Sequence, residues 1–418
     1  MALYRRSKNT KIPLLRNILN LIPKFIIQKG RNMFLSDKGC HKYFLEDQLI
    51  SLMFGQLSKC YTLGDISIGI SPSLTFLKDI GLSQSPGKST MSAGNAKRDY
   101  RVFEYLFTEL LKYYRKSLEK NHQSIIIEEI KNHTIKIIDS TTISLCLSLF
   151  DWAKFRTAKG GLKIHTVWDE NLALPEFINI TTASVHDSKG LSNNIFKKGT
   201  IIVEDRGYFE FKLFKSRIDN HNIFVTRIKD NTVYESIREL ELPEKKDQHI
   251  LKDEIIKLTS KKAKTEEIDT IELRRVVVFD PETNQTIEII TNQLDWLAST
   301  IASLYKKRWA IELFFKAMKQ NLQIKTFLGC SENAVKSQIY VAMITYLLLE
   351  LTRRVYAKGK SAFSTFVEKI RICIMHYKSF ECVFSHLKPT VQKVKQKGPP
   401  TLFDQDNFEG QIEISFPK

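Results

Sequence analysis

Three carboxylates in this chain of 418 residues stand where they could act together. Asp139 closes the apolar run "IKIID" and Asp205 closes "IIVED", so each is expected at the end of a buried strand, at the rim of a sheet. Glu312 belongs to "LYKKRWAIELFFKAMKQNLQIK", a helical pattern with cations around the acid. Carboxylates converging from two strands and one helix can hold two divalent ions about 3.5 to 4 Å apart, an arrangement used for phosphoryl transfer. Because carboxylate oxygens suit Mg²⁺, the pattern predicts two Mg²⁺ ions, with Mn²⁺ as a substitute.

The helical pattern around Glu312 has one polar side. At about 100° per residue, six residues fall within roughly 80° of arc. They are Tyr305, Arg308, Glu312, Lys316, Lys319 and Gln323. A solvated face with i,i+4 ion pairs is the simpler interpretation. Three cations around one acid are nevertheless better suited to a polyanion beside a metal, which makes Arg308, Lys316 and Lys319 candidate phosphate contacts.

Several neighbouring residues have ordinary structural explanations. An Asp that closes a strand is often a turn former. His165 and His186 could meet a metal or a phosphate, yet a single histidine beside a strand is more often structural, so both stay outside the catalytic set. Trp309 and Phe315 could stack on an extruded base, although core packing is the expected use of an aromatic side chain on this helix.

The loop after Asp205 carries the motif "DRGY". Arg206 and Tyr208 flank its glycine and are expected to shape the loop. Arg206 is in addition a candidate contact to DNA.

Composition favours an anionic partner. The chain has 64 Lys and Arg against 46 Asp and Glu, a formal net charge of +18 and a pI near 9.4, which favours nucleic acid or an anionic membrane surface. The six cysteines are scattered without a C-x-x-C pair, so a zinc finger or a disulfide framework is not expected, and a reducing cytosol fits.

Neither of the two apolar stretches in the chain predicts a membrane protein. Arg16 and Lys24 interrupt the apolar residues near the N-terminus, and no small-residue cleavage site follows, so no signal peptide is expected. The longest apolar stretch, "IYVAMITYLLLEL" from Ile339, stops short of the roughly 18 residues that a spanning helix needs and predicts a buried core helix.

The texture of the sequence changes along the chain. Residues 12–114 are helical in pattern, and "SPGKSTMSAGNAKRDYRVFEYLF" has the outline of a helix-turn-helix or of a plain bundle. From about Ile125, β-branched runs separated by turns predict successive strands. A Lys/Glu-rich stretch and the hairpin "LRRVVVFDPETNQTIEIITN" follow, and helical periodicity returns near Leu294. After Lys388 the tail is basic and contains prolines.

At these residues the chain resembles the IS4-family DDE transposases. Tyr305, Arg308, Glu312 and Lys319 match the family's Y-x2-R-x3-E-x6-K signature without a gap. The blocks "IIDSTTI", "GLKIHTVWD", "TTASVHDS", "VEDRGY" and "FLGCSENAVKSQIYVAMITYLLL" are also similar to the family, and the ordered set covers most of residues 12–355.

The resemblance implies an α/β fold with an RNase H-like mixed-sheet catalytic core, a β-rich insertion and an all-α N-terminal domain. The interval between Asp205 and Glu312 is too long for an uninterrupted core, which places the insertion there. The expected parts are a helical, DNA-end-binding region at 1–125, the core at 126–228 and 293–355, the insertion at 229–292, and a C-terminal helix with a basic tail at 356–418.

The resemblance also implies a function. The protein would be an insertion-sequence transposase that binds terminal inverted repeats and carries out Mg²⁺-dependent strand cleavage and strand transfer. Asp139, Asp205 and Glu312 would be its catalytic and metal-binding residues, while Tyr305, Arg308 and Lys319 would contact phosphates at the transposon end. The implied partners are double-stranded DNA, as transposon ends and target, and a second copy of the chain in the synaptic complex. The implied location is the cytoplasm of a prokaryotic cell, at the nucleoid and without a membrane partner.

Three alternatives remain open. An RNase H-like nuclease would cut without joining, and a catalytically silent relic would bind ends without cutting. A glycoside hydrolase also uses paired carboxylates, but a chain of charge +18 with bases around its third acid matches neutral sugars poorly. The helix after Ser361 and the basic tail are candidates for the contact between two copies.

Overall fold

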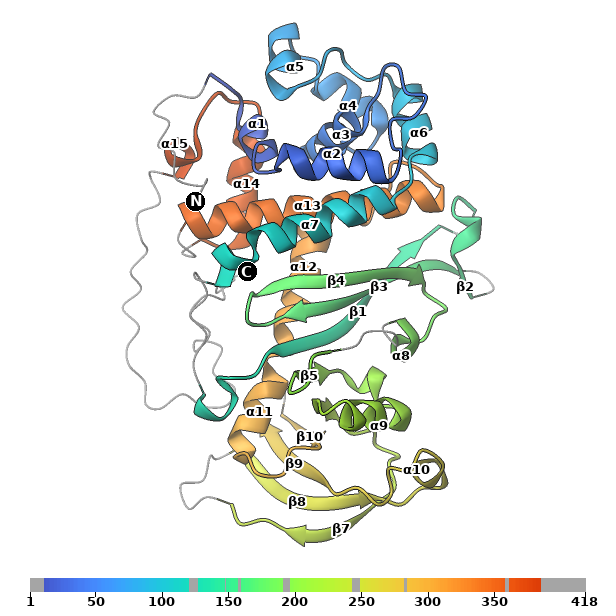
Figure 1. The fold of residues 1–418 in the computed structure, drawn as a ribbon, viewed down its shortest axis with the longest axis vertical. Helices are drawn as coiled ribbons and strands as arrows, with labels where there is room; N and C mark the ends of the chain where they lie inside the picture. The colour runs from blue at the N-terminus through green and yellow to red at the C-terminus, as the bar shows by residue number, and fades with distance from the viewer. Residues whose placement is uncertain are drawn as a thin grey trace.

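The computed structural model of the protein is a stack of layers, with helices above a large sheet (Figure 1). It describes residues 11–119, 127–146, 148–156, 159–190, 196–242, 249–281, 284–357 and 361–384. The basic tail that the sequence predicts after Lys388 therefore lies outside the described residues.

The N-terminal part is helical, as predicted. Its helices are α1 (Leu14–Leu19), α2 (Lys24–Met33), α3 (Leu45–Ser58), α4 (Leu63–Gly69), α5 (Leu74–Ile80), α6 (Lys88–Lys97) and α7 (Arg101–Glu119). Side chains define where two of them begin, because Thr62 and Ser73 each accept a hydrogen bond from a backbone N–H of the first turn of α4 and α5. Helix α3 is buried along almost its whole length, so it forms the centre of this layer.

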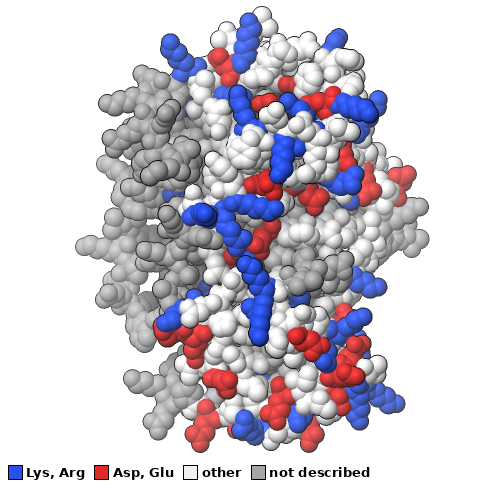
Figure 2. Space-filling model, viewed as in Figure 1, with Lys and Arg blue, Asp and Glu red and all other residues white. Residues whose placement is uncertain are grey.

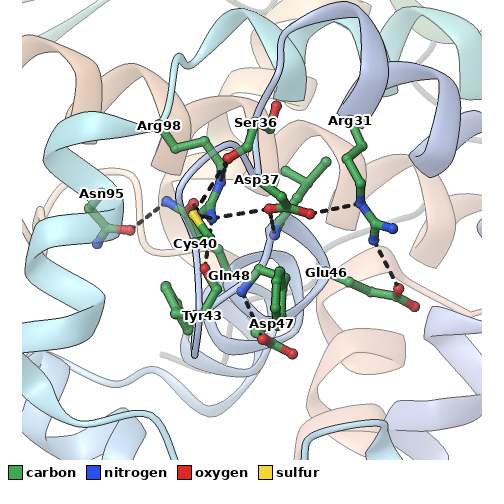
Figure 3. A network of polar contacts seen from close by, with 12 residues as sticks. Arg31, Ser36, Asp37, Cys40, Tyr43, Glu46, Asp47, Gln48, Asn95 and Arg98 are labelled. Atoms are coloured by element: carbon green, nitrogen blue, oxygen red, sulfur yellow. Dashed lines mark hydrogen bonds and ion pairs between the residues drawn. The ribbon is translucent and has the colours of Figure 1, made fainter.

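One buried arginine ties this helical part together (Figure 3). Arg98, which follows α6, donates to the backbone carbonyls of Ser36 (3.0 Å) and Tyr43 (2.7 Å) and forms an ion pair with Asp37 at 3.3 Å. It also contacts Gln48 of α3, whose amide donates to Asn95 of α6 at 2.7 Å. The loop between α2 and α3 is thereby fixed to the end of α6.

The predicted strand runs form one mixed sheet. Its core strands are β1 (Ile135–Leu145), β3 (Lys159–Asp169), β4 (Leu174–Thr182), β5 (Ile201–Glu204) and β6 (Ile223–Arg227). Strands β4, β3 and β1 pair antiparallel, and β5 and β6 then continue in parallel with β1. A short strand, β2 (Lys154–Arg156), adds to β3. This order confirms the RNase H-like fold, and every residue of β5 is buried, as expected for a parallel strand covered on both faces.

The β-rich segment after β6 extends the same sheet. It consists of β7 (Tyr234–Glu239), β8 (Ile250–Leu258), α10 (Lys261–Thr265), β9 (Leu273–Asp280) and β10 (Gln285–Thr291). The predicted hairpin corresponds to β9 and β10, and β10 pairs antiparallel with β6. The sheet therefore has ten strands, with the order β2-β3-β1-β5-β6-β10-β9-β8-β7 and β4 against β3.

The remaining helices cover and connect the layers. They are α8 (Asp187–Gly190), α9 (Phe211–Asp219), α11 (Ala298–Lys306), α12 (Trp309–Asn321), α13 (Glu332–Tyr356), α14 (Phe363–Cys373) and α15 (Phe380–Phe384), with 3-10 turns η1 (Glu128–Ile130), η2 (Asp151–Ala153) and η3 (Arg206–Tyr208). Helices α11 and α12 run from the extended part of the sheet up to the helical layer (Figure 1).

Helix α13 carries the long apolar run. Among the described residues it is the one helix long and apolar enough to cross a membrane, and nearly all of that run is buried inside the protein. It packs against α3 and α7 (Figure 1). Tyr346 of α13 contacts Phe314 of α12, whose ring contacts Trp168 of β3. The predicted buried core helix is confirmed, and it joins the helical layer to the sheet.

Candidate active site

The fold brings Asp139 and Asp205 together. Asp205 directly follows β5, as predicted. Asp139 lies within β1, so the expectation that it closes its strand is wrong: the residues after it continue the pairing with β3 as far as Leu145. These strands are parallel neighbours, and their register pairs Ile138 with Glu204. Asp139 and Asp205, the next residue on each chain segment, are therefore side by side.

Glu312 reaches the same place from above the sheet. It lies in the first turn of α12, which packs against β1. The charges of Asp205 and Glu312 both raise the pKa of Asp139, so all three carboxylates lie within one electrostatic neighbourhood. The structure thus brings together the three acids that the sequence singles out.

The surroundings of Asp139 disfavour the ionised form of its carboxyl group. Burial raises its pKa to about 7, and the charges of Asp205 and Glu312 add to the rise. The backbone N–H of Ser140, which donates to Asp139 Oδ1 at 2.7 Å, and the charge of Arg308 act in the opposite direction. A nearby cation stabilises the ionised form of a buried carboxyl group whose pKa is raised in this way, and a divalent ion bound by the carboxylate oxygens would supply that positive charge.

Arg308 supplies a cation to this cluster. Its Nη1 lies 3.6 Å from Asp139 Oδ2 and also forms an ion pair with Glu312. The guanidinium is partly buried, and its Nε has no hydrogen-bond partner. Among the described residues, no three carboxylate, imidazole or thiolate side chains stand close enough to ligate one ion together. The acids are neighbours, and a guanidinium bridges two of them.

The other residues of the predicted polar stripe are divided between two helices. Tyr305 is buried in the last turn of α11, and its ring lies 5.8 Å from the guanidinium carbon of Arg308, in the link to α12. Gln323 does not belong to the stripe, because α12 ends at Asn321 and the backbone of Gln323 instead bonds the side chains of Gln56 and Gln338.

The lysines of α12 border an open pocket of about 480 Å³. Two of the acids face it together with the cations. Its lining residues are Asp139, Ser140, Thr141, Glu312, Phe315, Lys316, Lys319, Gln320 and Lys325. Burial lowers the pKa of Lys319, and the charge of Lys325 lowers it further. Acids and a cluster of positive charge thus face one space large enough for a phosphodiester.

Sequence reasoning missed Lys325. Its side chain lies beyond the end of α12, so a helical projection of the stripe could not place it beside Lys319. Its proximity depends on the extended turn that begins at Leu322.

The aromatic and loop residues give mixed outcomes. Phe315 is buried against Phe314, as expected, but Trp309 is 53% exposed, so the expectation of core packing is wrong for Trp309. Trp309 opens α12 and faces away from the side on which Ile311 packs. Tyr208 is buried in η3, while the exposed Arg206 lies 3.6 Å from Asp230 at the surface.

The two histidines occupy structural positions. His165 is fully buried, and burial lowers its pKa to about 4, so it is neutral near pH 7. Its Nε2 lies 2.9 Å from the hydroxyl of Thr181. His186 contacts Ser188 in its own turn. Neither histidine lines the pocket.

The comparisons with known proteins agree with this geometry. Residues 130–348 match the family model described as "Transposase DDE domain". A transposase named y4zB from Sinorhizobium fredii is 32% identical over 65% of this chain and 72% of its own length. The protein named as the transposase of insertion sequence element IS5377 from Geobacillus stearothermophilus is 29% identical over 57% of this chain and 61% of its own length. One named for insertion sequence element IS4SA, from Synechocystis, is 28% identical over 68% and 75%.

Proposed function

The chain belongs to the DDE transposase family and is of the IS4-like insertion-sequence type, and from this premise we propose that it cuts and joins the ends of its own mobile element. Hydrolysis of a phosphodiester by water would free a 3′-OH at each transposon end. That hydroxyl would then displace an oxygen at a phosphodiester of target DNA, forming one P–O bond and breaking another. Both steps are in-line displacements at phosphorus, so one site can serve both.

One observation carries the proposal. Asp139 and Asp205 lie side by side on neighbouring strands with Glu312 in the same electrostatic neighbourhood, and Asp139 and Glu312 share a pocket with three lysines. A nuclease or a transposase needs this combination, because acids hold cations while bases hold the phosphodiester. A site for neutral sugars would not need the three lysines, because such a substrate carries no negative charge.

Asp139, Asp205 and Glu312 are the residues that would hold Mg²⁺, two ions in our proposal. When bound there, the ions would supply activation of the attacking oxygen and charge stabilisation for the leaving oxygen. Lys316, Lys319 and Lys325 would grip the phosphates on either side of the cut, and Tyr305 would hold Arg308 in place through its ring.

Arg308 would couple DNA binding to the acids. In the protein alone its guanidinium bridges Asp139 and Glu312. A phosphate that enters the pocket would offer the Arg308 guanidinium a bidentate partner. If the guanidinium moved to that phosphate, the carboxylates of Asp139 and Glu312 would become available to a metal ion. Binding of the DNA end would therefore favour binding of the metal, and the site would assemble on its substrate.

The net charge of the chain suits DNA as a partner. Lys and Arg side chains occur at the top, middle and bottom of the face in Figure 2, with acidic residues among them. The net charge of +18 would supply salt-dependent backbone binding. We assign recognition of the terminal inverted repeats to the helical N-terminal part, and expect two copies of the chain to pair two ends at the nucleoid of a prokaryotic cell.

The test is a reaction in vitro with Mg²⁺ on DNA that bears the ends flanking this gene. Wild type, Asp139→Asn and Glu312→Gln are compared, with Asp219→Asn on α9 as a control. The proposal is supported if the wild type cuts the ends in a metal-dependent reaction and forms joined products, and if both site variants abolish this reaction. Cutting without joining identifies a nuclease, and specific end binding without cutting identifies a silent relic.

A further inference from the structure

A second polar cluster lies on the face of β1 opposite to Asp139. Because side chains alternate along a strand, Ser140 points away from the acid that precedes it. Opposite Ser140 in the antiparallel ladder stands His165 of β3, with Lys163 two residues away on the same face. Asp187, the first residue of α8, lies over these side chains. Ser140 also lines the pocket of the acids, but the function proposed above gives no role to Lys163, His165 or Asp187.

Asp187 makes two charge-assisted contacts here. Its Oδ1 accepts a hydrogen bond from the Ser140 hydroxyl at 2.5 Å and lies 3.2 Å from the Lys163 ammonium. Lys163 also donates to the carbonyl of Val185 at 3.1 Å. Burial raises the pKa of Asp187, but the bonds from Ser140 and Lys163 outweigh it and leave the pKa below its ordinary value. Asp187 is therefore an anion with its own paired cation, Lys163.

The turn that carries Asp187 is held tightly. The backbone carbonyl of Gly190 accepts from the Asn179 side chain at 2.9 Å. A Cβ on Gly190 would lie 2.2 Å from His165 Nδ1, so only glycine fits between α8 and this buried ring. The position of Asp187 is thus set by packing as well as by its ion pair.

Asp187 is next to the segments that carry Asp139 and Asp205, because its hydroxyl partner Ser140 follows Asp139 and its helix α8 packs against η3. Ser140, whose hydroxyl it binds, donates its backbone N–H to Asp139 at 2.7 Å. On the other side, Asp187 Oδ2 lies 3.5 Å from the place of a Cβ on Gly207, in the turn η3 that follows Asp205. The buried hydroxyl of Tyr208, in the same turn, feels the charges of both Asp187 and Asp139.

We propose that Asp187, paired with Lys163, is a positioning residue that fixes the directions of the Asp139 and Asp205 carboxylates for metal binding. The proposal rests on the metal-binding role proposed for these acids. A carboxylate that orients metal ligands from behind typically contributes a factor of 10 to 100 in metal affinity or activity. Asp187 acts through Ser140 on one acid and against η3 on the other, so that one anion sets the spacing of the pair.

The test measures metal binding by the full chain without DNA, by calorimetric titration with MnCl₂. Asp187→Asn is expected to weaken Mn²⁺ binding about 10-fold to 100-fold, while the melting temperature without metal and the binding of transposon-end DNA without metal stay those of the wild type. The matched control is Asp219→Asn, which removes an Asp paired with Lys215 at 2.7 Å on α9 and should leave Mn²⁺ binding unchanged. Wild-type Mn²⁺ affinity in a folded Asp187→Asn protein overturns the proposal.

Gentler variants decide the case if Asp187→Asn fails to fold. Lys163→Arg retains the cation and should bind Mn²⁺ nearly as the wild type does, whereas Lys163→Met should not. Ser140→Ala should weaken binding, and combining it with Asp187→Asn should add little, because both act along one path. Fully additive effects would instead make Asp187 a direct ligand and overturn the positioning role.

A parallel titration of Asp139→Asn separates this proposal from the one on which it rests. Loss of Mn²⁺ binding in Asp139→Asn with normal binding in Asp187→Asn, Lys163→Met and Ser140→Ala refutes the positioning role alone. Normal binding in Asp139→Asn refutes the metal site itself.

Discussion

At the scale of single residues, the sequence predicts which acids meet but not how they are held. Asp139, Asp205 and Glu312 are recognisable because apolar runs and helical periodicity surround them. The bridge that Arg308 makes between two of them, and the approach of Lys325 to Lys319, depend on the link between α11 and α12 and on the turn after α12. No spacing rule encodes these contacts, since they arise only when the helix ends are known.

The crowding of these acids should make the metal-free protein sensitive to pH. The pKa of Asp139 in the folded protein is about 7, above its ordinary value of 3.8. Folded protein thus binds this proton more tightly than unfolded protein, and the free energy of unfolding falls as the pH rises from about 4 to about 7. Asp139→Asn removes this pH-dependent loss of stability, which amounts to about 1.4 kcal/mol for each unit by which the pKa of Asp139 is raised in the folded protein.

Thermal melts in a chelator from pH 4 to pH 8 check this prediction. The Asp139→Asn variant should melt higher than the wild type above pH 7 and equally near pH 4. Asp269→Asn, in the insertion, serves as the control. Melting curves of wild type and Asp139→Asn that run parallel over the whole pH range would contradict the assignment of this pKa.

At the scale of elements, strands were the more predictable part. Runs of β-branched residues mark β1, β3, β4, β5 and β6, and the hairpin of β9 and β10 is visible as two such runs around a turn. What the sequence does not show is that β10 pairs with β6, because that contact joins segments separated by the whole insertion. Trp309 was mispredicted for a related reason, since burial on α12 depends on which side meets the sheet.

The Arg98 contacts offer a test of one element's stability. Arg98→Met leaves the carbonyls of Ser36 and Tyr43 and the side chain of Gln48 without their buried donor. We expect a loss of about 3 kcal/mol in the free energy of unfolding, as for other buried polar networks that lose one member. Urea unfolding measures it.

The neighbouring Arg101 is the matched control. Its side chain is 63% exposed and pairs with Asp99 at the surface, so Arg101→Met should cost at most about 1 kcal/mol. Equal losses for the two variants would show that the Arg98 contacts do not stabilise the helical part.

At the scale of the whole molecule, charge should govern affinity for DNA. With a net charge of +18, binding of the transposon ends should fall about 10³-fold to 10⁵-fold between 50 and 200 mM salt if 6 to 10 phosphates are contacted. Lys319→Ala should reduce the slope of log K against log salt by about 1, because one phosphate contact disappears. Lys262→Ala, which replaces an exposed lysine of α10, is the control. Affinity that does not change with salt would argue against phosphate-dominated binding.

The burial of α13 also decides how the protein can be taken apart. The helical N-terminal part precedes the sheet in the chain, yet its helices α3 and α7 pack against α13, which comes after the third acid. A fragment that stops before β1 would present those apolar faces to water and should aggregate, so expressing the helical N-terminal part by itself requires supplying residues 332–356 as well. Exchange of N-terminal parts between related elements is restricted in the same way, because a transplanted part must fit the α13 of its new host.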